Sequence, residues 1–247
     1  MTGRSIDFTR RKSYNSRRVS ELLSVLLVLA ALLLLYSRSG RGDAVSASAP
    51  AVPLPVLVID PGHGGIDGGA VGIDGTKESD LNLRIALKMQ AIAQLYGAAT
   101  QMTRVDDSRR TDILAYSEHE DLVYRTNLIN QVDNGVLFSV HMNFFPTSQP
   151  SGAQILYAAG EGSAELGELT QHNIVSYLQP ENRRLAEPAP SRLYITSHVS
   201  CPAILAECGF LSNLSELEKL CDNRYQSSMA LLLTGSYLQF INPTIST

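Results

Sequence analysis

The sequence predicts an α/β protein, a single domain with a mostly parallel central sheet flanked by helices, preceded by one N-terminal transmembrane helix. From about residue 54 onwards, short apolar runs alternate with amphipathic segments of helical period, which is typical of a sheet covered on both faces. Before that point, a long apolar run follows a cluster of basic residues, which is typical of a membrane anchor. A length of 247 residues allows one domain with a smaller addition.

The expected elements of the body fill residues 56–241. Six apolar runs are expected to form strands: Val56–Ile59, Ala98–Met102, Val136–Val140, Ala153–Tyr157, Leu193–Ile195 and Ala203–Ala206. Four segments are expected to form helices: Asp80–Tyr96, Asp121–Val132, Ala164–Leu178 and Tyr225–Phe240. In the first helix, Leu81, Ile85 and Met89 recur at four-residue spacing, and Gly97 can close it in the left-handed conformation.

The N-terminal segment divides into three parts. Residues 1–18 form a tail with six basic residues, which the distribution of charge places in the cytoplasm. Residues 19–36 form the expected signal anchor, because 18 helical residues at about 1.5 Å each are just enough to span a bilayer core. Residues 37–55 are rich in Ser, Gly, Ala and Pro and are expected to form a tether. Cleavage of a signal peptide after Ala49 or after Ala47 is the alternative. Pro50 directly after Ala49 and the distance of both sites from the apolar run disfavour it.

Charge and cysteine content exclude two classes of protein. Residues 1–43 hold eight of the 20 Lys and Arg residues but only three of the 24 Asp and Glu residues, so residues 44–247 carry a net charge of −9. Such an acidic body argues against nucleic acid as a partner, because phosphate binding requires clustered positive charge. Three cysteines, an odd number, argue against a disulfide scaffold.

Four polar residues are expected to meet at one edge of the sheet. His63 follows the first strand, His141 the third and Glu207 the last, while Glu78 begins the helix that returns from the first loop. In open α/β sheets, sites form beyond the carboxyl ends of the strands. Two histidines with carboxylates at such an edge are suited to a zinc site that keeps a position open for water.

Each of these residues also has a structural interpretation. The glycines around His63 could form a phosphate-binding loop, although they lack the Gly-Lys-Ser/Thr ending of one. Glu78 is favourable at a helix start without any ligand. His141 could be a core histidine, with Ser139 as a hydrogen-bonding neighbour on the same strand face. Glu207 lies between two apolar runs, and a buried carboxylate there needs a metal, a cation or a raised pKa.

The remaining chemically active residues are weaker candidates. Surface or structural roles are expected for His119, His172 and His198. Cys208 adjoins Glu207 but lies in an apolar run, which favours an inert buried thiol over a nucleophile. Three arginines that could hold an anionic substrate are expected to be exposed to solvent instead: Arg109, Arg110 and Arg125.

Four sequence blocks resemble those of a known enzyme family. They are Asp60-Pro-Gly-His63-Gly-Gly, Lys77-Glu78, Ser139-Val-His141-Met-Asn143 and Glu207-Cys-Gly-Phe-Leu-Ser-Asn213. In this order they are similar to the signature blocks of the zinc-dependent N-acetylmuramoyl-L-alanine amidases of the amidase-3 family, across the whole body. The resemblance implies Zn²⁺ ligated by His63, Glu78 and His141, with Glu207 as the catalytic carboxylate. The resemblance also implies hydrolysis of the bond between N-acetylmuramic acid and L-alanine in peptidoglycan.

Finer features most resemble the sporulation or germination-specific subgroup that acts on spore cortex. These include the single anchor, the absence of a wall-binding repeat module, Thr103-Arg104 and Ser151-Gly-Ala-Gln154. The resemblance implies a role in cortex maturation (muramic-lactam formation) or related wall remodelling by a single-pass bacterial membrane protein with an extracytoplasmic catalytic domain. It leaves open an activating protein partner. Two alternatives are an inactive, membrane-tethered wall-binding protein and a zinc peptidase that cleaves another stem-peptide bond.

Overall fold

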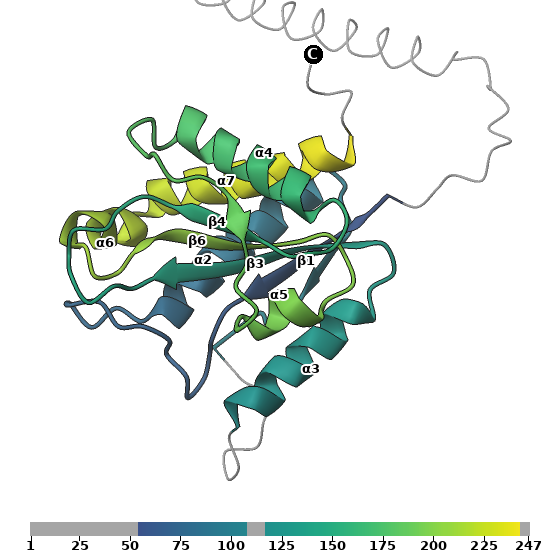
Figure 1. Ribbon diagram of the computed structural model, residues 1–247, viewed down its shortest axis with the longest axis horizontal. Coiled ribbons are helices and arrows are strands. Elements are labelled where there is room, and N and C mark those ends of the chain that lie inside the picture. Colours follow the sequence, from purple (N-terminus) through teal and green to yellow (C-terminus); the bar gives the residue numbers. More distant parts are fainter. Residues whose placement is uncertain (1–53, 108–116, 243–247) are drawn as a thin grey trace, which may run out of the picture. The chain divides into compact units, whose positions relative to one another are not determined.

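The body of the protein is built around one six-stranded sheet with helices on both faces (Figure 1). A computed structural model describes residues 54–107 and 117–242. The strands are β1 (Val56–Pro61), β2 (Thr100–Met102), β3 (Gly135–Asn143), β4 (Gln154–Tyr157), β5 (Glu187–Pro188) and β6 (Ala203–Phe210). The helices are α2 (Glu78–Leu95), α3 (Glu118–Asn130), α4 (Ser163–Tyr177), α5 (Tyr194–His198), α6 (Leu214–Cys221) and α7 (Asn223–Ile241).

The strand order is β2-β1-β3-β6-β4-β5. The neighbours β2, β1, β3 and β6 are parallel, β4 runs antiparallel to β6, and β5 is parallel to β4. The predicted single α/β domain with a mostly parallel sheet is therefore confirmed. Because β1, β3 and β6 run in the same direction, their carboxyl ends meet at one edge of the sheet.

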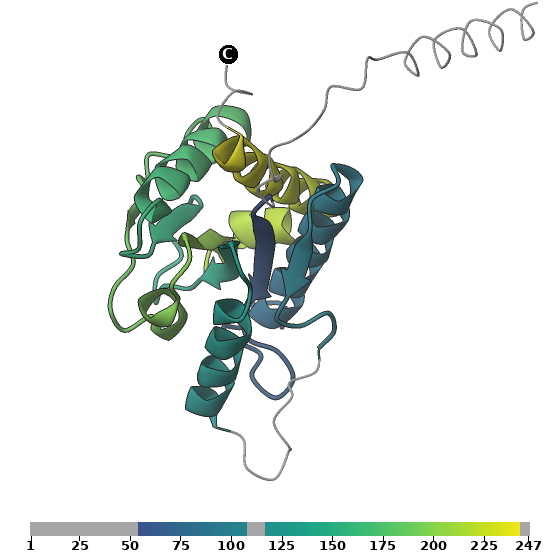
Figure 2. The same ribbon diagram turned by 90° about the vertical axis from the view of Figure 1, so that its right-hand side faces the viewer.

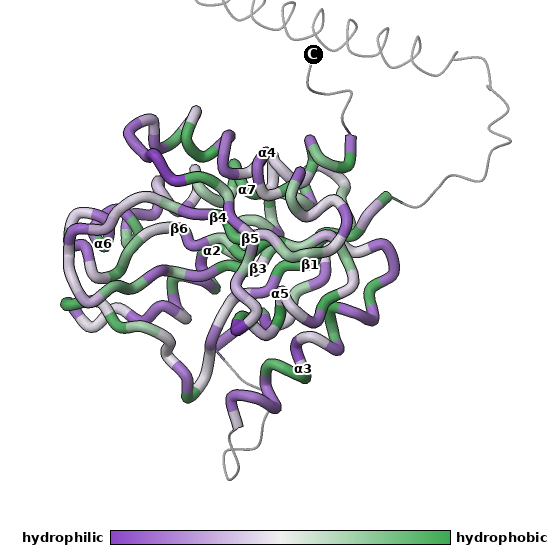
Figure 3. Tube along the Cα trace, viewed as in Figure 1, coloured by the Kyte–Doolittle hydropathy of each residue, from purple (hydrophilic) through white to green (hydrophobic). Residues whose placement is uncertain are grey.

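The two faces of the sheet carry separate hydrophobic cores, and Figure 3 shows hydrophobic residues concentrated in the central strands. Side chains alternate along β3, so Phe138 points into the larger core beneath α2, α4, α6 and α7. Leu137 points the other way, into a smaller core with Ile129 of α3 and Ile195 of α5. Figure 2 shows the two helical layers on either side of the sheet. The smaller layer leaves room beside the carboxyl edge.

Most predicted elements form within a few residues of their expected bounds, but one predicted strand is wrong and two short elements were not predicted. The predicted strand Leu193–Ile195 is wrong, because Leu193 caps α5 and accepts a hydrogen bond from Ser197 N. A run of three apolar residues is too short to distinguish a helical from an extended period. The helix α6 and the short strand β5 were not predicted. Asn213 initiates α6 by accepting a hydrogen bond from Glu216 N.

The predicted tail (1–18), anchor (19–36) and nearly all of the tether (37–55) lie outside the described residues. Among the helices of residues 54–107 and 117–242, none combines the length and apolarity required to cross a membrane.

Candidate metal centre and active site

The glycine-rich loop after β1 makes room for two side chains. A Cβ atom on Gly62 would lie only 2.2 Å from the ring of His141. A Cβ atom on Gly69, whose φ is +66°, would lie 2.6 Å from Glu78 Oε2 and 2.7 Å from His63 Cδ2. These glycines allow the backbone to approach the histidines and Glu78 closely. Their position supports a ligand site and gives no support to the alternative of a phosphate-binding loop.

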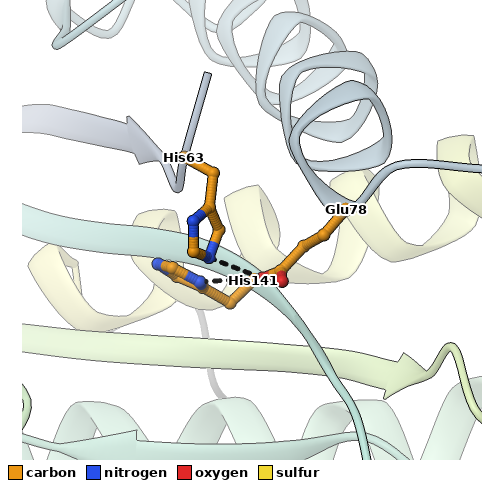
Figure 4. A group of neighbouring side chains, drawn as sticks. All are labelled: His63, Glu78 and His141. Carbon is orange, nitrogen blue, oxygen red and sulfur yellow. Dashed lines mark hydrogen bonds and ion pairs between the residues drawn. The ribbon is translucent and has the colours of Figure 1, made fainter. Parts of the chain in front are cut away.

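His63, Glu78 and His141 point toward one another (Figure 4). His63 Nε2 lies 3.3 Å from Glu78 Oε1, and His141 Nδ1 lies 3.0 Å from the same oxygen. One potential ligand atom from each residue falls within 4.8 Å of the others. Ligand atoms around a tetrahedral zinc with bonds of about 2.0–2.2 Å are separated by roughly 3.3–3.6 Å. This group can therefore close around a metal ion with small side-chain movements.

Glu78 and His63 are each held in place by neighbours. Glu78 is the first residue of α2, where its Oε2 accepts from Ala70 N at 2.9 Å and its Oε1 from Met142 N at 3.1 Å. Burial acts to raise the pKa of Glu78, but the two histidines more than offset this and hold it well below its usual range. His63 has a φ of 58°, and its Nδ1 lies 2.7 Å from Asp67 Oδ2. A carboxylate bonded to the far nitrogen of a ligating histidine fixes the orientation of the ring.

Glu207 lies directly beside His141 in the sheet. The register pairs His141 of β3 with Glu207 of β6, and both side chains line the same cavity. Within the described residues, the buried Oε2 atom of Glu207 has no hydrogen-bond partner. Burial and the charge of Glu78 raise the pKa of Glu207 to about 7, although the two histidines act in the opposite direction. An unsatisfied buried carboxylate is costly, so this atom is expected to have a partner during function.

The four residues open into a cavity of about 340 Å³. Its lining includes Glu118 and Leu122 from the first turns of α3, and Arg192 and Tyr194, whose ring meets that of His119 of α3 edge-on. The floor is the carboxyl end of the sheet. The cavity lies on the sparsely covered face, which leaves the metal-ligand group accessible to a substrate.

A second polar cluster lies on the same face, and two of its residues, Arg125 and Ser139, also line the cavity. Asp60 is fully buried and accepts hydrogen bonds from Arg125 at 2.6 and 2.8 Å, Ser139 at 2.7 Å and Thr103 at 2.7 Å. The prediction that Arg125 is exposed is therefore wrong, because the sequence does not show that its partner is a buried aspartate. Ser139 donates to Asp60 and is not the neighbour of His141 that its strand position suggested.

The outcomes for the weaker candidates are mixed. His119, His172 and His198 are exposed, as predicted. Cys208 is buried, as predicted, and burial raises the pKa of its thiol, which favours the inert form. Arg109 and Arg110 lie outside the described residues.

Two residues that the sequence analysis did not assign to the site support it. Asp67 orients His63, and its position four residues later in the same loop was the available signal. Arg104 donates to the carbonyl oxygens of Pro61, Gly62 and Ser79, which holds the glycine loop against α2. The sequence identified Arg104 only as a mark of resemblance.

The part of the chain that carries this site matches one known protein family. The family model described as N-acetylmuramoyl-L-alanine amidase matches residues 57–235, which include all four site residues. The chain belongs to the N-acetylmuramoyl-L-alanine amidase family. The germination-specific N-acetylmuramoyl-L-alanine amidase of Bacillus subtilis is 32% identical over 91% of this chain and 96% of its own length.

Solved structures of amidases share the fold. The CwlD amidase from Clostridioides difficile, solved in complex with the GerS lipoprotein, superposes with a TM-score of 0.73 and 30% identity. That match covers 76% of this chain and 99% of the neighbour. The catalytic domain of CwlV from Bacillus (Paenibacillus) polymyxa has a TM-score of 0.65 and 26% identity, over 76% of this chain and 99% of its own.

Proposed function

We propose that this amidase hydrolyses the bond between the lactyl group of N-acetylmuramic acid and L-alanine in peptidoglycan, using zinc held by His63, Glu78 and His141. The observation that carries the proposal is the group of three ligands beside Glu207, whose buried Oε2 has no partner in the part of the chain that the structure describes, all facing one cavity. Nitrogen and oxygen ligands from two histidines and a glutamate suit zinc with a fourth position free for water or substrate.

The proposed roles follow from the geometry. A bound zinc ion supplies Lewis acidity, which polarises a carbonyl and lowers the pKa of a bound water. Glu207 accepts the proton of the attacking water and returns it to the departing amine of L-alanine. Asp67 keeps Nε2 of His63 directed at the ligand position by accepting from Nδ1.

We further propose that the physiological substrate is spore cortex peptidoglycan. The relative from Bacillus subtilis is named germination-specific, and its alignment extends beyond the described body into the N-terminal segment. The neighbour from Clostridioides difficile was solved with a lipoprotein, which supports a search for an activating partner of this chain.

The proposed location is the outer face of a bacterial membrane, with residues 19–36 as an uncleaved anchor. The six basic residues of the tail and the length of the apolar run support it. Protease added to intact protoplasts should digest the catalytic domain and leave residues 1–18 protected. N-terminal sequencing of the membrane fraction should begin at the start of the chain, and sequencing that begins at Pro50 instead contradicts an anchor.

Mass analysis of digestion products tests the activity most directly. Residues 54–247 suffice for this, because the solved neighbours correspond to this body alone. With zinc, we expect glycan whose muramic acids lack peptide, together with free stem peptides that begin with L-alanine. Without zinc, we expect neither product. Shortened peptides still attached to glycan would indicate a zinc peptidase, and unchanged peptidoglycan with bound protein would indicate an inactive wall-binding protein.

A further inference from the structure

A groove on the outer surface of α2, α4 and α7 lies far from the chemistry already described. It has a volume of about 620 Å³. Most of the side chains that line it are apolar or aromatic, and we call these the outer groove: Leu54, Ile92, Tyr96, Tyr177, Leu231, Leu232, Leu238 and Ile241. Three uncharged polar residues complete the lining: Asn173, Gln239 and Asn242. Among the described residues that line it, none carries a charge.

Several large hydrophobic side chains of the outer groove are exposed to solvent and lie outside the buried core. Leu54 and Tyr96 are each 68% exposed, Tyr177 is 75% exposed and Leu231 is 51% exposed. Leu95, next to Tyr96, is 86% exposed. Contiguous apolar surface of this kind is typical of a face that contacts lipid or another molecule. Tyrosine in particular is enriched where one end of a side chain meets lipid and the other meets water.

The position of the outer groove relative to the active site is fixed by the sheet. The α7 helix covers the face that carries Phe138, whose ring meets Tyr237 of α7 edge-on. His141 and Glu207 lie on the opposite face, which α3 and α5 cover in part (Figure 1). The outer groove and the catalytic cavity therefore open on opposite sides of the domain.

The described chain begins and ends at this groove. Leu54, the first described residue, lines it, and so do Ile241 and Asn242 at the other end. The segment leading to the proposed anchor thus leaves the body from the groove. A tether of 19 residues has an average reach of roughly 25 Å, below the roughly 40 Å width expected for a compact domain of this size. If residues 19–36 form the proposed anchor, a tether of this length would keep the exit point of the body close to the bilayer.

We propose that the outer groove rests on the lipid surface of the membrane that anchors the chain, inserting Tyr96, Tyr177 and Leu231 at the level of the headgroups. This inference rests on the proposed location. With the groove against lipid, the catalytic cavity faces away from the bilayer, toward the wall polymer. Because the groove carries no charge, its binding is hydrophobic and does not require anionic lipid.

Vesicle flotation of residues 54–247 tests this contact without the anchor. Phosphatidylcholine vesicles, alone and with phosphatidylglycerol, are the probes. We expect binding to both, changing less than about twofold between low and high salt, since counterion screening does not weaken apolar insertion. The double variant Tyr177→Ser, Leu231→Ser should bind at least about tenfold more weakly. The matched control is Ile73→Ser, Leu185→Ser, which changes side chains that are 87% and 74% exposed elsewhere.

Three outcomes overturn the proposal. The first is no binding to either vesicle, or equal binding by both double variants. The second is binding that occurs only with the anionic vesicles and that high salt abolishes. The third is binding by residues 54–247 that disappears when residues 37–53 are restored, because the groove then accommodates its own tether. None of these results depends on whether the anchor is cleaved, which the protease experiment on protoplasts measures separately.

Discussion

Two polar clusters lie on the same face of the sheet, within a few residues of each other along β1 and β3. In the first cluster, Asp60 and Arg125 are buried and joined by two hydrogen bonds, and Ser139 and Thr103 satisfy the remaining oxygen lone pairs. In the second cluster, three ligand groups converge, and the buried Oε2 of Glu207 has no partner among residues 54–107 and 117–242. The residue types are similar, but only the first cluster is complete.

This difference separates a structural role from a chemical one. A buried ion pair with its hydrogen bonds filled has nothing left to bind, and its removal is expected to affect folding. A buried group with unfilled bonding capacity, beside a cavity, is expected to receive a metal, a water or a substrate. Substitutions in the first cluster should therefore lower stability, and substitutions in the second should lower metal binding or turnover.

Arg125→Ala is the most damaging change expected in the first cluster. It leaves the carboxylate of Asp60 buried and without its charge partner, which should lower the free energy of unfolding by about 3–5 kcal/mol. Urea denaturation of residues 54–247 measures this. The exposed Arg192→Ala is the control and should change stability by less than about 0.5 kcal/mol. A loss below about 1 kcal/mol in Arg125→Ala would show that the pair is not structural.

Glu207→Gln, in the second cluster, should lower turnover and leave stability unchanged. We expect turnover to fall by roughly 10²-fold or more, because the proton carrier is lost, with zinc content and stability retained. Peptide release from peptidoglycan and zinc analysis on the same preparation check both parts. Near-normal turnover would remove Glu207 from the mechanism. Loss of zinc together with activity would make it a fourth ligand.

Acid should weaken the first cluster through Asp60. Burial acts to raise the pKa of Asp60. The charge and hydrogen bonds of Arg125, and the hydrogen bonds from Ser139 and Thr103, outweigh burial and lower this pKa from the usual 3.8 to about 2. Because the pKa of Asp60 is lower in the folded state than in the unfolded state, its ionisation stabilises the fold at any pH above the unfolded-state pKa. This contribution of roughly 2 kcal/mol to the free energy of unfolding is lost as the pH falls through about 2. A carboxyl ¹³C titration should show Asp60 ionised at pH 3. A midpoint near 4 would contradict the assignment.

The smallest effect is expected from Asp67→Asn in the second cluster. An amide accepts a weaker hydrogen bond from His63 Nδ1, so the ring is held less firmly and zinc affinity should fall about tenfold. Competition with a chelator measures the affinity. Asp74→Asn, in an exposed turn of the same loop, is the control and should leave affinity unchanged. Equal affinities in both variants would mean that Asp67 has no orienting role.

The sequence predicted the second cluster better than the first. His63, His141 and Glu207 each follow an apolar run, and strand ends converge in a parallel sheet, so their meeting was predictable from local pattern. Asp60 and Arg125 are separated by 65 residues, and no local signal identifies which of several arginines a buried aspartate takes as its partner. The two-residue alternation along β3 assigned Ser139 and His141 to one face but could not distinguish their hydrogen-bond partners.

Metal content tests the central claim, that the incomplete cluster is a zinc centre. Purified wild-type residues 54–247 and the variants His63→Ala, His141→Ala and Arg192→Ala are dialysed against trace zinc and measured by elemental mass spectrometry. The wild type and Arg192→Ala should hold about one zinc per chain, and the two histidine variants should hold almost none while remaining folded. Zinc retained in full by both histidine variants would contradict the claim.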